Sequence, residues 1–154
     1  MAFKVSTPHL HIKSEVMSMA EERARKVAVN VLNYAGNEAI EEARDHGDYT
    51  DQTGNLRSSI GYVVTDGTTI SSSNNKVYKG GHEGAEKANG LLKKYAEQHH
   101  DDIELHLVAG MEYAGYVERI HHKNVLSSAR ILLDDIVPKR LEESGLTVKK
   151  ISKR

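Results

Sequence analysis

The sequence predicts an α+β fold in which a long N-terminal helix and a C-terminal helix pack on a small, mainly antiparallel sheet. Three observations predict it: a helical apolar period through residues 16–43, alternating apolar residues at 60–65 and 103–109, and a C-terminal helical period over 126–141. Helices and strands do not alternate regularly enough for a doubly wound parallel sheet. Because no internal repeat or second domain is visible, we expect a single domain over residues 1–154.

The first helix is predicted between Ser14, a suitable N-cap, and Gly47, a suitable C-cap. Between them, apolar residues recur every three or four positions, as on one buried helical face. They include Ala20, Ala24, Val27, Val31, Ala35 and Ala39. The opposite face carries charged residues, Arg44 among them, and we expect it to face solvent. An alanine-rich stripe lets another backbone approach closely, and either the sheet or a neighbouring subunit fits this role.

The strands and the remaining helices follow from shorter patterns. Residues 60–65 alternate as in a strand, and the Asp-Gly pair at 66–67 predicts a hairpin turn into a weaker strand at 68–73. A second amphipathic helix is predicted at 85–96, and a further strand at 103–109. The sheet therefore contains at least three predicted strands.

Three segments are predicted to lie outside the packed elements. They are an extended N-terminal arm at 1–13, a mobile loop rich in Ser, Asn and Gly at 71–84, and a basic C-terminal tail at 145–154. Asn124 is predicted to cap the last helix, which Pro138 is expected to bend.

Composition excludes several classes of function. Lys and Arg number 21 and Asp and Glu 22, and this near-neutral balance argues against a general polyanion binder, which needs an excess of cations. The chain has no cysteine, so disulfides, thiolate metal sites and cysteine nucleophiles are excluded. No window is long and apolar enough to span a bilayer, and residues 1–14 lack the apolar run of a secretion signal, so we expect no membrane partner.

Nine histidines raise the question of a metal site, especially at 99–102 and 121–122. Adjacent residues point in different directions, and neither H-x-x-x-H nor H-E-x-x-H occurs, so we expect solvated histidines and no metal or cofactor. The sequence has no G-x-S-x-G motif, and its glycine cluster at 80–84 lacks the G-K-[ST] ending of a phosphate-binding loop. We therefore expect no enzymatic activity. The cations at 149–154 are expected to form a solvated tail, with DNA contact as the alternative.

Two tyrosines, Tyr113 and Tyr116, follow the strand predicted at 103–109. Aromatic rings with a polar tip suit half-wet surfaces such as protein interfaces, and they also suit a position packed under a sheet. The sequence leaves both interpretations open.

Two segments resemble motifs of the small tail-completion or neck proteins of long-tailed phages. Residues 51–60, DQTGNLRSSI, resemble the segment D-x-T-G-x-L-R-x-S-I, and residues 108–118, VAGMEYAGYVE, resemble a strand that runs into Y-A-x-Y-V-E. A short N-V-L element at 124–126 follows, as in that family, and a long helix precedes the first motif. From this resemblance we assign the following residues to an assembly or structural motif: Asp51, Thr53, Gly54, Leu56, Arg57, Ser59, Gly110, Tyr113, Ala114, Tyr116 and Glu118.

The resemblance implies a structural subunit of the head-tail connector, encoded by a phage or prophage and without catalytic residues. Such a subunit assembles as a homo-oligomeric ring with other neck, connector or tail-tube proteins around the DNA channel, and it can be monomeric in isolation. It belongs to the virion, and to the host cytoplasm during assembly. Two departures, at 119–122 and in a helical insertion at 74–100, are consistent with a distinct subgroup. A minor capsid or tail-terminator protein, or a small nucleic-acid-binding regulatory module, remains an alternative.

The first motif also has a direct physical interpretation. Thr53 can cap a short helical turn, Gly54 tolerates tight backbone geometry, and Leu56 anchors the turn in the core. Arg57 then lies beside the following strand, and we expect it to pair with a carboxylate such as that of Glu118.

Overall fold

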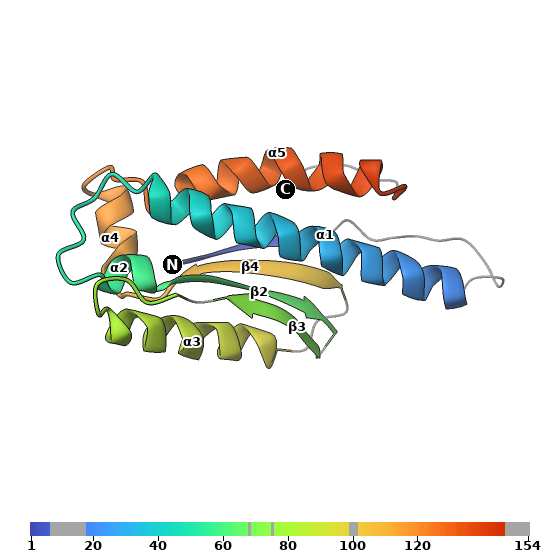
Figure 1. Ribbon diagram of the computed structural model, residues 1–154, viewed down its shortest axis with the longest axis horizontal. Helices are drawn as coiled ribbons and strands as arrows, with labels where there is room; N and C mark the ends of the chain where they lie inside the picture. The colour runs from blue at the N-terminus through green and yellow to red at the C-terminus, as the bar shows by residue number, and fades with distance from the viewer. Residues whose placement is uncertain (7–17, 68, 75, 99–101, 147–154) are drawn as a thin grey trace.

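A computed structural model of the protein describes residues 1–6, 18–67, 69–74, 76–98 and 102–146, and it confirms the α+β fold (Figure 1). The strands are β1 (Ala2–Ser6), β2 (Ile60–Asp66), β3 (Thr69–Asn74) and β4 (Ile103–Ala109). The helices are α1 (Ser18–Asp45), α2 (Asn55–Ser58), α3 (His82–Ala96), α4 (Ala114–Arg119) and α5 (Ser127–Glu143). The strands form one antiparallel sheet, and helices cover both of its faces.

The sheet has the strand order β1-β4-β2-β3. β2 pairs with β4 along its whole length, with Ile60 opposite Ala109. β1 pairs with the other side of β4, with Ala2 opposite Val108. β3 returns from β2 by a hairpin whose register shifts next to Val64. The two central strands are therefore the ones that the sequence pattern predicted most clearly, and β1 and β3 form the edges.

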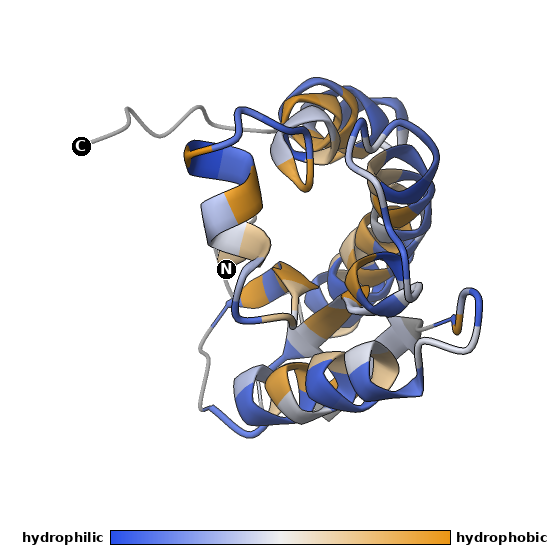
Figure 2. Ribbon diagram, turned by 90° about the vertical axis from the view of Figure 1, so that its left-hand side faces the viewer, coloured by the Kyte–Doolittle hydropathy of each residue, from blue (hydrophilic) through white to orange (hydrophobic). Residues whose placement is uncertain are grey.

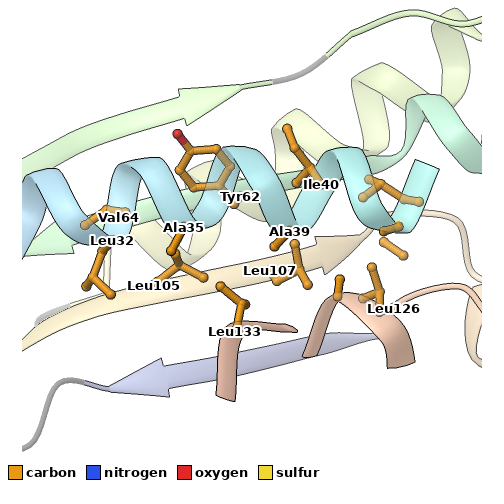
Figure 3. Close-up of a cluster of buried hydrophobic side chains, with 14 of the residues drawn as sticks. Leu32, Ala35, Ala39, Ile40, Tyr62, Val64, Leu105, Leu107, Leu126 and Leu133 are labelled. Atoms are coloured by element: carbon orange, nitrogen blue, oxygen red, sulfur yellow. The ribbon is translucent and has the colours of Figure 1, made fainter. Parts of the chain in front are cut away.

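Helices α1 and α5 cover one face of the sheet and enclose the large core (Figures 1 and 3). Alternate residues of β2 and β4 point into it, because successive side chains of a strand lie on opposite faces. Figure 3 shows this packing, with Leu32, Ala35, Ala39, Ile40, Tyr62, Val64, Leu105, Leu107, Leu126 and Leu133 labelled. The helix and strand periods of the sequence thus meet in a single buried layer.

Helix α3 covers the opposite face and encloses the small core. Val63 of β2 and Val108 of β4 pack there against Leu92 and Ala96 of α3. Both faces of the central strands are consequently buried, even though the sheet is antiparallel.

The alanine-rich stripe of α1 packs within the subunit. Ala28, Ala35, Ala39 and Ala43 are fully buried in the large core. At Gly36 the helix lies so close to the sheet that an added Cβ would be 2.5 Å from the Tyr62 ring. Of the two surfaces that the sequence allowed for this stripe, the sheet is therefore the one that it contacts.

Two segments differ from the sequence-based description. Within the predicted arm at 1–13, residues 2–6 form an edge strand, and residues 7–13 lie outside the described part of the chain, as does the Ser14 cap. The weaker strand predicted at 68–73 is confirmed as β3, whereas the predicted loop at 71–84 is too long, because it includes the end of β3 and the first turn of α3. Of the basic tail, only residues 145–146 are described. No helix in the described ranges is long and apolar enough to cross a membrane.

Candidate functional site

The two motif segments converge at one end of the sheet, where β2 begins and β4 ends. The backbone N–H of Gly110 donates to the carbonyl oxygen of Ser59 at 2.8 Å, which joins the second motif to the first. Helices α2 and α4 lie at this end, on the left in Figure 1, and Figure 2 looks onto it. Residues separated by more than 50 positions in the sequence therefore form one structural unit.

The polar residues of the first motif hold the short helix α2. The Asp51 carboxylate accepts the backbone N–H of Arg57 at 2.9 Å, and the Thr53 hydroxyl accepts that of Asn55 at 3.3 Å. These acceptors satisfy N–H groups that the first turn of a helix leaves unpaired. Leu56 is buried in the large core, and the Ser59 hydroxyl donates to its carbonyl oxygen at 2.7 Å. Each of these residues has a structural role.

Glycines let backbone pack directly against backbone around this motif. Gly54 has a φ of 77°, and an added Cβ would lie 1.9 Å from the Tyr78 carbonyl oxygen. An added Cβ on Gly84 would lie 1.9 Å from the Asn55 carbonyl oxygen, and one on Gly110 would lie 2.6 Å from the Ala88 nitrogen. The start of α3 therefore packs on both motifs. The glycines at 80–84 were the sequence signal for this contact. In the sequence they were considered as a phosphate-binding loop, which does not predict close backbone packing.

A buried serine reinforces the same contact. Ser58 is fully buried, and its hydroxyl oxygen accepts the Tyr78 backbone N–H at 2.7 Å. Sequence reasoning missed Ser58, because a serine at the end of a polar turn gives no indication of burial.

The predicted pairing of Arg57 with Glu118 is wrong. The Glu118 carboxylate accepts the backbone N–H of Leu126 at 3.1 Å and the hydroxyl of Ser127, so it caps the start of α5. Arg57 instead donates to the Gly47 carbonyl oxygen at 3.3 Å, and its guanidinium lies 5.5 Å from the centre of the Tyr49 ring. The unpaired N–H groups of a helix start supply the competing partner for the glutamate.

The prediction that Arg44 faces solvent is also wrong. Arg44 is 2% exposed, donates to the Ile60 carbonyl oxygen at 2.5 Å and lies 5.3 Å from the centre of the Tyr78 ring. Burial lowers the pKa of its guanidinium. Nearby, burial raises the pKa of Tyr49 to about 12. Arginine stacks on aromatic faces, so it can enter a crowded region at the end of α1 that a helical wheel assigns to the surface.

The aromatic residues of the second motif are on the surface. Tyr113, Tyr116 and Ile120 are 42%, 54% and 58% exposed. Tyr116 lies in α4, and Tyr113 and Ile120 flank it as the N-cap and C-cap residues. Their spacing of three and four residues places the three side chains along one side of the helix, while Ala114 is fully buried. We call these three exposed residues the α4 stripe. Of the two interpretations of the tyrosines, the structure excludes packing under the sheet.

The sequence also singled out Asn124 as a helix cap and the histidines as candidate metal ligands. The N-cap residue of α5 is Leu126, two residues after the predicted cap Asn124. The Asn124 side chain nevertheless accepts the backbone N–H of Ser128 in the first turn, at 3.0 Å. His121 contacts the edge of the Tyr116 ring, with centroids 5.0 Å apart. The doublet at 99–100 lies outside the described residues. Within the described ranges, no three His, Asp or Glu side chains are grouped so that they could hold a metal ion.

A groove between α1 and α5 has a volume of about 440 Å³. Val27, Val31 and Tyr34 line it on the α1 side. At its rim Arg140 donates two hydrogen bonds to the Glu38 carboxylate, at 2.6 and 2.8 Å. These residues form an internal ion pair beside apolar side chains, and the described lining contains no pairing of a nucleophile with a base.

No protein-family model, curated protein or solved structure matches this chain.

Proposed function

We propose that this protein is a structural subunit of a phage neck or tail, a tail-completion or head-tail joining protein that acts by forming a homo-oligomeric ring. Its partners in this role are further copies of itself and other connector or tail-tube proteins, with non-specific DNA contact in the channel. It acts in the virion and is made in the host cytoplasm. The motif resemblance supplies the family, and the α4 stripe is the observation on which the proposal rests.

The α4 stripe has the chemistry of a protein interface. Tyrosine is enriched at interfaces because its ring buries a large area and its hydroxyl can stay hydrated. The three exposed side chains follow one side of α4 from its N-cap to its C-cap, so a single partner surface can cover them together. Glu118, which ends the same motif, caps α5 and so has a structural role. The two tyrosines of the motif are instead exposed on the surface.

The interior of the motif region supports a rigid platform for such an interface. Gly54, Gly84 and Gly110 pack backbone against backbone, and Asp51 and Thr53 hold α2 in place. None of these contacts presents a reactive group to a bound molecule, which suits a structural subunit better than an enzyme.

Light scattering coupled to size-exclusion chromatography, from dilute to concentrated protein, tests the proposal. Negative-stain microscopy should then show closed rings with a central channel. A discrete dimer at every concentration would overturn ring formation, because an isologous dimer uses up its interface. A monomer at every concentration would make assembly dependent on a partner, and purified tails would then be the binding probe.

Two substitutions and one control test the stripe itself. Tyr116→Ser and Ile120→Ser should each shift the oligomer towards monomer. Ile131 on α5 is 70% exposed and serves as the matched control. Ile131→Ser should leave the oligomer unchanged. Equal effects of all three substitutions would indicate general loss of surface hydrophobicity, not a specific interface.

The alternative virion roles differ in what the protein accompanies. A tail-completion subunit should co-purify with tail tubes, whereas a minor capsid protein should co-purify with filled heads. DNA binding that weakens steeply with salt would instead favour the regulatory module.

A further inference from the structure

The sheet has two edges that no other described strand covers. β1 and β3 are its outer strands, five and six residues long. In Figure 1, β3 is the strand nearest the viewer, and no helix is drawn in front of it. An outer strand presents backbone N–H and C=O groups on one side, and these can pair with a strand of another chain.

The two edges have opposite polarity. All three pairings in the order β1-β4-β2-β3 are antiparallel, so β1 runs opposite to β3. When a second copy is placed beside the first in the same orientation, its β1 lies antiparallel to β3 of the first copy. That pairing repeats the mode used everywhere else in the sheet. Because the two surfaces differ, the contact is heterologous, and such contacts form rings when the rotation closes.

Among the described residues, neither edge carries the usual protection against pairing. Natural edge strands are often blocked by proline, by several charges or by a covering helix. β1 (AFKVS) and β3 (TISSSN) contain no proline, and their one charged residue is Lys4. Lys4 forms an ion pair with Glu104 of β4, so its charge is already compensated. The register shift in the β2–β3 hairpin lies at its turn end, and Ser72 and Ser73 pair regularly with β2.

The β1 edge also begins next to the region of the α4 stripe. The Met1 carbonyl oxygen accepts the Ala109 backbone N–H at 3.1 Å, and Ala109 ends the strand that leads through residues 110–113 into α4. A strand added to β1 therefore approaches the same end of the molecule as the proposed interface.

We infer that β3 of one copy pairs with β1 of the next, antiparallel, so that the sheets of neighbouring subunits form one continuous sheet around the ring. This inference rests on the proposed ring and specifies the contact that builds it. The edge pairing supplies backbone hydrogen bonds, and the α4 stripe adds apolar burial beside it.

The chain has no cysteine, so introduced thiols report this contact without background. Lys4 lies on the α3 side of the sheet, because it is opposite His106, which is two residues from Val108 of the small core and therefore on the same face. Its partner Glu104 lies on that face too. Ser73 is on that side too, because it is opposite Val63, which packs in the small core. Ser72 is on the other side, since its hydroxyl lies 3.0 Å from that of Tyr62. Within one chain, β1 and β3 are three strand spacings apart, about 14 Å, which is too far for a disulfide.

The experiment compares two double variants of the full chain under oxidation or with a short thiol-to-thiol reagent. Lys4→Cys with Ser73→Cys should give a ladder of covalent oligomers, because both thiols lie on the same side of the shared sheet. Lys4→Cys with Ser72→Cys is the matched control, and it should give at least fivefold less product. Ala2→Cys can replace Lys4→Cys if loss of the ion pair impairs folding, because Ala2 also packs against the small core. Thermal unfolding verifies that each variant is folded.

The outcomes separate the edge pairing from the proposed function. A ladder specific to the Ser73→Cys variant supports the pairing. Closed rings without this ladder would overturn the pairing and leave the ring function standing. A ladder from open filaments without closed rings would support the pairing and overturn the ring. Equal cross-linking of both double variants, or none in concentrated protein, would overturn the inference.

Discussion

Substitution of Gly54 by alanine tests how closely the first motif packs against the segment before α3. Gly54 has a φ of 77°, and the new Cβ would lie 1.9 Å from the Tyr78 carbonyl oxygen, far inside the 3.4 Å at which such contacts become ordinary. The left-handed conformation costs an L-residue about 1–2 kcal/mol. Forcing the two backbone segments apart adds about 1–3 kcal/mol, as for overpacked cores. The loss of unfolding free energy should therefore total about 2–5 kcal/mol.

Gly80 provides the control, because its φ is also 77° but nothing lies within 4 Å of its added Cβ. Gly80→Ala should lose only the conformational part, about 1–2 kcal/mol. Urea unfolding of both variants measures the difference, which isolates the steric contact with Tyr78. Equal losses of free energy in the two variants would show that Gly54 does not approach the Tyr78 backbone this closely.

Three further predictions concern other parts of this end of the molecule. Gly84→Ala should destabilise the protein, because the added Cβ would lie 1.9 Å from a backbone oxygen. Gly90 lies in the same helix but has nothing within 4 Å of its added Cβ, so Gly90→Ala should stabilise the protein by up to about 1 kcal/mol. Thermal unfolding measures both changes. The Tyr49 pKa of about 12 means that the folded state holds this proton more tightly than the unfolded state, so stability should fall from pH 10 to 12. Tyr49→Phe should flatten that part of the pH profile, and an unchanged slope would contradict the assignment. Glu118→Ala should cost about 1 kcal/mol by removing the acceptor for the Leu126 N–H, and unchanged stability would show that water replaces it.

The elements with a strong apolar period were predictable from the sequence. The alternation at 103–109 gave β4 its observed bounds, and the alanine stripe identified the buried face of α1. In both cases one local period determines which side chains are removed from water, so no knowledge of distant residues is needed.

The elements and contacts that depend on distant partners were predicted only in part or not at all. The hairpin turn predicted β3 only as a weaker strand at 68–73, and residues from 71 on were also assigned to a loop, because the serine-rich sequence has little strand preference of its own; its pairing with β2 makes it a strand. The capping role of Glu118 depends on where α5 begins relative to α4. The burial of Arg44 depends on Tyr78, which lies in a segment without an apolar period. Each of these outcomes is a competition between partners that a local pattern does not contain.

The glycine contacts at the motif end have a consequence for the thermodynamics of the proposed assembly. Side chains that fill an interface usually lose rotamer freedom on binding, and loops that support them lose more. At Gly54, Gly84 and Gly110 the support consists of backbone in direct contact with backbone, which has no rotamers to lose. The conformational entropy of this end is therefore lost when the subunit folds, and a partner that binds there meets a surface that is already ordered.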